Sequence, residues 1–231
     1  CVPCKRFRST VQVQKMADLP PSRVDTTHNP FYVSGADLFG PFGVKIGRSV
    51  HKRWICLFSC HASRAIHLEV VFSLSTDSFI NAVRRFQSRR GFIHSLNLDH
   101  GTNNVGANRE LNASINAWNR SELGQRLRQQ NIEFSFNAPK ASHAGGNYER
   151  MIRSVREHLR FVIEEQRLTD ESLLTIIAEV EWIVNSRPIV ATSDDPEDLR
   201  ALTPNDLLVI RPMEGLPPGI FTEADLHRRK W

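Results

Sequence analysis

Short alternating patterns of apolar and polar residues follow residue 30, and they predict β-strands. Residues 31–37 alternate up to Asp37, residues 54–58 form an apolar run, and residues 65–72 place apolar side chains on one face. The Gly-Pro-Phe-Gly segment at 40–43 is expected to break the chain after the first strand. Together these stretches predict an antiparallel meander of three strands.

The apolar spacing changes to the helical period after Ser75. Four apolar residues between 79 and 86 recur on one helix face, and Gly91 is expected to end that helix. The later patterns predict a strand at 92–98, a polar helical region at 106–130, a strand at 132–136, a long helix after the loop at 139–146 and a helix at 170–185. A strand, a helix and another strand require a parallel pair with a right-handed crossover, so we expect an α/β fold with a mixed sheet flanked by helices.

The composition excludes several classes of protein. The chain has 231 residues, of which 40% are hydrophobic and 24% are charged, so a mostly disordered, collagen-like or coiled-coil protein is excluded. No apolar run approaches the length of a membrane span, and we expect no membrane partner. The 4 cysteines do not make a disulfide framework in a chain of this size, which favours a reducing compartment.

The distribution of charge indicates a polyanionic partner. The 30 Lys and Arg residues against 25 Asp and Glu residues give a formal net charge of +5. Basic residues gather at 45–64, 84–90 and 150–160, whereas acidic residues dominate from 164 to 198. One basic cluster is typical of a solvated face, but three clusters in one chain favour contact with phosphate groups.

Three carboxylates stand at positions where acids can meet. Asp37 and Asp99 each follow an expected strand, and Glu149 opens the long helix just after Gly145 and Gly146. If these ends are neighbours, the three negative charges repel one another unless a cation neutralises them, and hard oxygen ligands suit Mg²⁺ or Mn²⁺. Two such ions support phosphoryl transfer. The alternative remains open that the aspartates cap turns and that Glu149 only favours the helix dipole.

A row of arginines follows Glu149 along the same helical stripe. Arg153, Arg156 and Arg160 lie four, seven and eleven positions after it, so they share its side of the helix. A carboxylate followed by arginines would hold a metal and then follow a nucleic-acid backbone. The spacing also fits an ordinary surface with a solvated arginine face.

Seven stretches carry motifs in a fixed order along the chain: Gly35–Pro41, Arg53–Phe58, Thr76–Ile80, Asp99–Ala107, Ser142–Arg150, Asn185–Pro188 and Leu202–Asn205. In their order, and over nearly the whole chain, they resemble the integrase core of retroviruses and LTR retrotransposons, and most closely that of the BEL/Pao elements. The resemblance implies an RNase H-like fold with a five-stranded mixed sheet. It also implies a metal-dependent polynucleotidyl transferase that trims a DNA 3′ end and joins it to a target phosphodiester.

The resemblance also implies roles for individual residues. The family's catalytic and metal-binding triad, with two Mg²⁺ or Mn²⁺ ions, falls on Asp37, Asp99 and Glu149. We expect DNA, both element ends and target, as the partner, together with a homo-oligomer that joins two ends in concert. The expected location is a cytoplasmic particle and the nucleus. The residues expected to contact DNA are Arg150, Arg153, Arg156, Arg160, Asn103 and His143.

Cysteines and the chain ends complete the expectations. Cys1 and Cys4 resemble half of the family's His-His-Cys-Cys zinc module, so Zn²⁺ is expected only if an upstream His pair is present. Cys56 and Cys60 are interpreted as buried thiols. The expected domains are a remnant of the zinc module and a linker at 1–30, the catalytic core at 31–200, and at 201–231 an extension that begins a further domain.

Two departures from the family pattern keep other functions open. His100 follows Asp99, and Asn104 stands where the family has an aromatic residue. The alternative hypothesis is therefore a catalytically impaired or host-adopted protein that binds nucleic acid without cutting it. A metal-dependent endonuclease that does not join strands would share the same three carboxylates.

Overall fold

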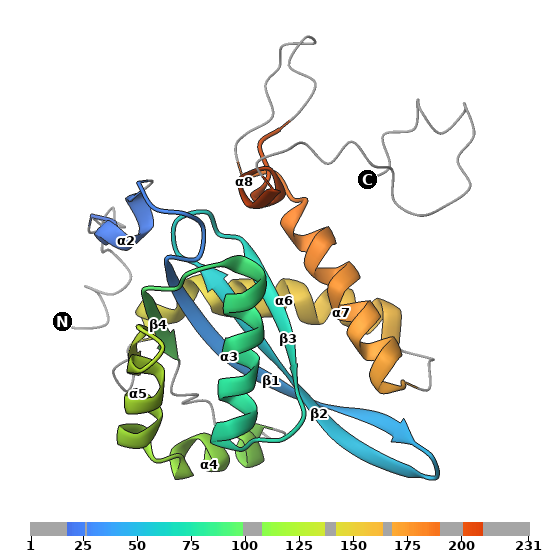
Figure 1. Ribbon diagram of the computed structural model, residues 1–231. Helices are drawn as coiled ribbons and strands as arrows, with labels where there is room; N and C mark the ends of the chain where they lie inside the picture. The colour runs from blue at the N-terminus through green and yellow to red at the C-terminus, as the bar shows by residue number, and fades with distance from the viewer. Residues whose placement is uncertain are drawn as a thin grey trace, which may run out of the picture.

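Figure 1 shows the computed structural model, coloured from the N-terminus to the C-terminus. It describes residues 18–25, 27–98, 108–136, 142–163, 168–189 and 201–209, and for 108–109, 142–149, 160–162 and 209 it describes the backbone alone. None of the helices among these residues is long and apolar enough to span a membrane.

A five-stranded mixed sheet forms the centre of the structure, as the periodicity predicts. Its spatial order is β3-β2-β1-β4-β5. The first three strands pair antiparallel as a meander, and β4 and β5 join β1 in parallel. The strands are β1 Val33–Ile46, β2 Ser49–Cys60, β3 Ile66–Val71, β4 Ser95–Leu98 and β5 Glu133–Phe136.

Helices cover both faces of the sheet (Figure 1). One apolar core lies between the sheet and α3, α4 and α5, and a second core lies between the sheet and α6 and α7. The short α8 packs against α7, where the side-chain amide of Asn205 donates to the carbonyl of Trp182 at 3.2 Å. The helices are α2 Pro21–Val24, α3 Thr76–Arg90, α4 Asn108–Ala117, α5 Arg120–Arg128, α6 Ser142–Ile163, α7 Asp170–Asn185 and α8 Pro204–Val209.

The expected break at 40–43 is wrong. The strand β1 continues through this segment to Ile46, and its pairing with β2 shifts register between Phe39 and Phe42. Gly40 has a φ of +139°, and a Cβ there would meet the ring of Trp54 at 3.2 Å. A residue without a side chain therefore lets the chain bulge at this point and continue as a strand.

The helix α6 begins earlier than the sequence suggests. Its backbone is helical from Ser142, so His143, Gly145 and Gly146 lie within the helix and not in a loop before it. Each glycine costs about 1 kcal/mol in a helix. The buried residues from Met151 onward hold the helix in place, and residues 142–150 extend it towards its N-terminus. Each residue added in this way contributes one backbone hydrogen bond, which offsets the cost of the glycines.

A buried network of charges joins β3 to helices on both faces. Glu69 is only 2% exposed, and its carboxylate accepts hydrogen bonds from Arg85 at 2.6 Å and from Arg89 at 3.0 Å. His67 lies within 3.0 Å of both Glu69 and Glu181. Arg90 pairs with Glu181. Since charges this deeply buried need partners, the network holds α3 and α7 to the same strand.

We predict that this network makes stability depend on pH. Burial acts to lower the pKa of His67, but hydrogen bonds to Glu181 and Glu69 outweigh it and hold this pKa above 6.5. Burial acts to raise the pKa of Glu69 and Glu181, but their bonds to His67 and their arginine partners hold both pKa values below 4.5. The carboxylate contribution is therefore lost as the pH falls through these lowered values, and the His67 contribution is lost as the pH rises through its raised pKa.

Urea unfolding across a pH series tests this expectation, with His67→Gln as the comparison. The free energy of unfolding of the wild type should fall relative to that of the variant as the pH rises from about 6 to about 9, because only the wild type carries the His67 proton that is lost there. Parallel curves for the two proteins would show that His67 does not titrate in this range.

Candidate active site at the ends of the central strands

Asp37 lies in β1, on the face of the sheet that α6 and α7 cover. Side chains alternate along a strand, and Phe39, two residues later, belongs to the core under α6 and α7, whereas Ala36 and Leu38 belong to the opposite core. Asp37 is half-buried, and its carboxylate accepts a hydrogen bond from the backbone N–H of Leu38 at 2.7 Å. A carboxylate on this face is therefore accessible and directed towards α6.

The strand β4 ends opposite Ala36, the residue before Asp37. Its pairing with β1 runs in register to Ala36 opposite Leu98. Asp99 follows Leu98 directly in the sequence and lies outside the described residues. Asn97 pairs with Gly35, so it shares the face of Asp37.

The sequence interpretation missed two polar residues on this face. Asn97 and Ser135 occupy paired positions on β4 and β5, and the Ser135 hydroxyl hydrogen-bonds to the Asn97 side chain. The alternation of Asn97 with the buried Leu96 and Leu98 was the available signal. These residues extend the polar surface beside Asp37 across the two parallel strands.

The helix α6 runs in the same direction as β1. The Arg156 guanidinium lies 5.4 Å from the ring centroid of Phe39. Leu168, five residues after the end of α6, accepts a hydrogen bond from the backbone N–H of Lys45 at 2.8 Å. The contacts on β1 thus advance from Phe39 to Lys45 as the chain advances from Arg156 to Leu168, which favours placing the N-terminal turns of α6 towards the part of β1 that holds Asp37.

The basic residues of α6 point outward from a helix that is tightly packed. Met151, Ile152, Val155 and Leu159 are buried against the sheet. The flanking side chains of Arg150, Arg153 and Arg156 are exposed. The cluster on α3 differs, because Arg85, Arg89 and Arg90 pair with the acids of the buried network.

Several predicted site residues lie wholly or partly outside the described residues. Within the described part of the chain, no group of three His, Cys, Asp or Glu residues could hold a metal ion. Asp99, the second member of the proposed triad, is outside it. The other residues are Asn103, Cys1 and Cys4, together with the side chains of Glu149, His143 and Arg160.

The two cysteines of β2 are buried thiols, as expected. Cys56 is 0% exposed and Cys60 is 2% exposed, and the Cys60 sulfur accepts a hydrogen bond from the backbone N–H of Phe31 at 3.1 Å. Burial raises the pKa of the Cys56 thiol well above its ordinary value, and the nearby negative charges of Asp37 and Glu69 raise it further. A thiol that stays protonated is a poor nucleophile and a poor metal ligand, so Cys56 has a packing role.

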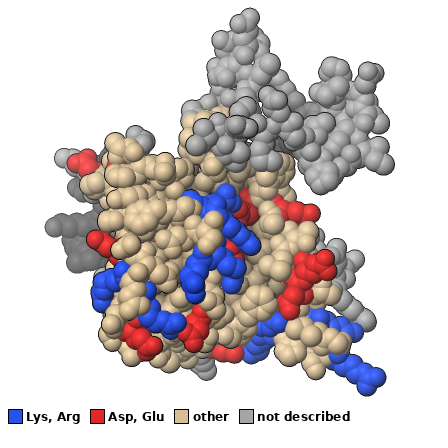
Figure 2. Space-filling model, in the orientation of Figure 1, with Lys and Arg blue, Asp and Glu red and all other residues tan. Residues whose placement is uncertain are grey.

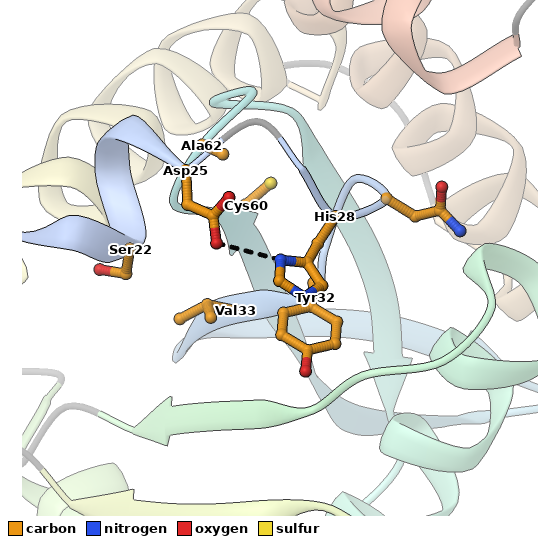
Figure 3. A pocket seen from close by; sticks show the side chains of 8 residues that line it. Ser22, Asp25, His28, Tyr32, Val33, Cys60 and Ala62 are labelled. Atoms are coloured by element: carbon orange, nitrogen blue, oxygen red, sulfur yellow. Dashed lines mark hydrogen bonds and ion pairs between the residues drawn. The ribbon is translucent and has the colours of Figure 1, made fainter.

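A small pocket lies at the N-terminal end of β1, as Figure 3 shows. Its volume is about 50 Å³, room for little more than water, and Asp25, His28, Tyr32 and Cys60 are among the residues that line it. His28 stacks on Tyr32 with ring centroids 3.9 Å apart, and its Nδ1 lies 3.0 Å from Asp25. The same Nδ1 also faces Thr27, so the groups do not form a relay from acid through imidazole to nucleophile.

Comparison with known proteins identifies the fold. No family model matches the sequence, and no curated protein matches it significantly. A chain from the cryo-EM structure of the simian T-cell lymphotropic virus intasome in complex with PP2A regulatory subunit B56 gamma has a TM-score of 0.57 at 13% identity, covering 95% of this chain and 67% of that chain.

Two integrase catalytic cores are also similar at lower scores. The HTLV-2 core in complex with magnesium (trimeric form) has a TM-score of 0.49 at 15% identity, covering 78% of this chain and 97% of that chain. The BIV core has a TM-score of 0.47 at 12% identity, covering 76% and 93%. At these identities the likeness shows the fold alone, and it confirms the RNase H-like fold of retroviral integrase cores that the resemblance implies.

We predict that the exposed arginines of α6 contribute little to folding. Leu159→Ala should lower the free energy of unfolding by about 2–5 kcal/mol, because it opens a cavity under the helix. Arg153→Ala should change it by less than about 0.5 kcal/mol, because Arg153 is exposed. Urea unfolding measures both values. A loss of similar size in the two variants would mean that the arginine row is structural.

Proposed function

We propose that the chain is the catalytic core of a retroelement integrase. In this proposal, Asp37, Asp99 and Glu149 hold divalent metal ions, and the protein trims DNA 3′ ends and joins them to target DNA. The observation that carries the proposal is the parallel register of β1 and β4, which sets the end of β4 opposite Ala36, next to Asp37, on a sheet with the integrase-core fold.

Covalent geometry supports placing Asp99 beside Asp37. Leu98 is paired with Ala36, the residue before Asp37. Asp99 follows Leu98 directly, and consecutive Cα atoms are about 3.8 Å apart, so the proposal places Asp99 close to Asp37. The two carboxylates would then meet beside the C-terminal end of β4, and ligands bind at such strand ends in sheets of this kind.

The course of α6 supports placing Glu149 at the same point. Glu149 precedes Arg156 by seven residues, or about 10 Å along a helix. Asp37 precedes Phe39 by two residues, or about 7 Å along a strand. Since Arg156 lies over Phe39 and the two elements run in the same direction, the two lengths favour a position of Glu149 on the part of α6 close to Asp37.

The residues fit a hard divalent cation. Asp37 offers carboxylate oxygens from a half-buried position, and Asn97 and Ser135 add oxygen atoms on the same face. Cys56 does not compete, because its pKa is raised and its side chain belongs to the opposite core. Mg²⁺ or Mn²⁺ bound by the three acids would stabilise charge on the attacking and leaving oxygens of a phosphodiester.

The arginines of α6 would position the DNA. Arg150, Arg153 and Arg156 are exposed along about one and a half turns of the helix that carries Glu149. Guanidinium groups bind phosphate oxygens in pairs of hydrogen bonds, so they would hold a strand in register while the acids act on one phosphodiester. Asn103, His143 and Arg160 are further proposed contacts to this strand.

The remaining expectations extend the same proposal. The element would be of the BEL/Pao type, the core would span 31–200, and residues at either side would belong to a zinc module and to a further domain. Two copies or more would act together on paired DNA ends, and the protein would act in a cytoplasmic particle and in the nucleus. Zinc would bind Cys1 and Cys4 only in a longer chain with a His pair.

A strand-transfer assay tests the proposed reaction. The substrate is an end-labelled duplex with the terminal sequence of the source element, incubated with plasmid DNA and Mg²⁺ or Mn²⁺. We expect joined products from the wild type and a rate at least about a hundredfold lower from Glu149→Gln, because a metal ligand is lost. Glu157→Gln is the matched control, since Glu157 is an exposed acid on the same helix and should keep full activity.

The products distinguish the open alternatives. Cutting without joining would indicate an endonuclease, with the same dependence on Glu149. DNA binding with no products from the wild type would contradict the enzyme and support an integrase-derived binding protein. Equal activity of the Glu149 and Glu157 variants would exclude Glu149 from the reaction.

A further inference from the structure

The hairpin of β1 and β2 projects past the candidate active site. The strands β1 and β4 are parallel, and β4 ends level with Ala36, whereas β1 continues to Ile46. Nine residues separate Asp37 from Ile46, a distance of about 30 Å along a strand. Figure 1 shows this ribbon extending away from the rest of the sheet. We call residues 42–53 of this hairpin the arm. The arm therefore leaves the sheet at the end where Asp37 lies.

The arm is paired to its tip and held at its base. Its pairing continues to Ile46 opposite Ser49, and Gly47, with a φ of +59°, allows the two-residue turn. The base is held on one side by Arg53, whose guanidinium donates to Asp170 on α7 at 2.7 and 3.0 Å. This pair fixes the direction in which the arm points.

The opposite side of the base is tied to α4. The Lys52 ammonium lies 2.6 Å from the carboxylate of Glu110. Because this pair and the Arg53 pair come from the two faces of the ribbon, the arm is braced from both sides. A braced arm loses little conformational entropy when it binds a partner.

The arm carries only positive charge. No Asp or Glu occurs between Asp37 and Glu69 in the sequence. Among the described residues, Lys45 and Arg48 have no ion-pair partner, whereas Lys52 and Arg53 are paired. Figure 2 shows Lys and Arg side chains at the projecting end of the molecule. The tip therefore presents two uncompensated cations to solvent.

One face of the arm combines charge with an exposed apolar residue. Lys45 pairs with Val50, and Gly43 pairs with Lys52. The side chains of Lys45, Val50 and Lys52 therefore share a face of the arm. Val50 is 73% exposed. A ribbon of two strands is narrow enough to lie along or enter a groove of duplex DNA, where its lysines can reach phosphates.

We propose that this arm binds the phosphate backbone of duplex DNA about eight or nine base pairs from the phosphodiester at the active site. The distance follows from the length of β1 beyond Asp37 and a rise of about 3.4 Å per base pair. The inference rests on the proposed function, since it takes the DNA at Asp37 as its reference. Lys45 and Arg48 supply the contacts, and the braced base keeps them on the path of the duplex.

The salt dependence of DNA binding tests the arm. The probe is a fluorescent 30-base-pair duplex of arbitrary sequence, about 100 Å long, with binding to the full chain measured by anisotropy at several salt concentrations. The test variant is Lys45→Gln with Arg48→Gln. The control is Arg84→Gln with Arg128→Gln, which removes the same charge from two exposed arginines of α3 and α5.

We expect the slope of log K against log salt to fall by about 2 in the arm variant, because two phosphate contacts are lost. The control should keep the slope of the wild type, and all three proteins should unfold at the same temperature. Equal slopes for the arm variant and the wild type would overturn the proposal and leave an acidic protein surface as the partner of the arm.

The outcome for the arm can be distinguished from the outcome for the proposed function. Loss of slope in the arm variant supports the arm even if no strand transfer is found. Strand transfer that depends on Glu149, with an unchanged slope in the arm variant, would overturn the arm and retain the enzyme. A change in slope of the same size in the control would also overturn the arm, because it would reflect total charge alone.

Discussion

The parallel register of β1 and β4 is the constraint on which the proposed site depends. It sets Ala36 opposite Leu98, and the next residues in the sequence are Asp37 and Asp99, the first two acids of the proposed site. A slip by one residue would turn every side chain of β4 to the other face. Leu96 and Leu98 oppose that slip, because both are fully buried in the core under α3. Apolar packing on one face thus determines which polar groups meet on the other.

On the second face of the sheet, the packing of α6 determines where its arginines lie. Its buried stripe fixes the helix on β1, and Arg156 lies over Phe39 at the edge of that contact. The same packing leaves Arg150 and Arg153 exposed. On both faces of the hairpin, the Asp170 and Glu110 ion pairs brace a basic arm beyond the site. Contacts with β1 and β2 thus position both the exposed arginines of α6 and the cations of the arm, and a polyanion that lies along β1 would meet both groups.

Most of the sheet and its helices could be predicted, because buried elements carry clear periods. The sequence offered Ser75 or Thr76 as the cap of α3 and Gly91 as its stop; the structure has the cap at Ser75 and confirms the stop at Gly91. The bulge at Gly40 was not, because a Gly-Pro pair commonly ends a strand and only the packing of Trp54 explains its continuation. Asp37 was predicted to follow a strand, but it lies within β1, because the strand continues to Ile46; the face on which it lies depends on the register. The buried role of Glu69 was also missed, since its partners come from α3 and α7 through tertiary contacts.

The most direct test of the central claim is a crystal structure of the protein with Mn²⁺, with the metal located by anomalous scattering. The account predicts Mn²⁺ within about 2.2 Å of oxygen atoms of Asp37, Asp99 and Glu149, in an octahedral arrangement completed by water. It also predicts that the ions lie on the face of the sheet under α6. Mn²⁺ bound elsewhere, or these three carboxylates too far apart to share an ion, would contradict the account.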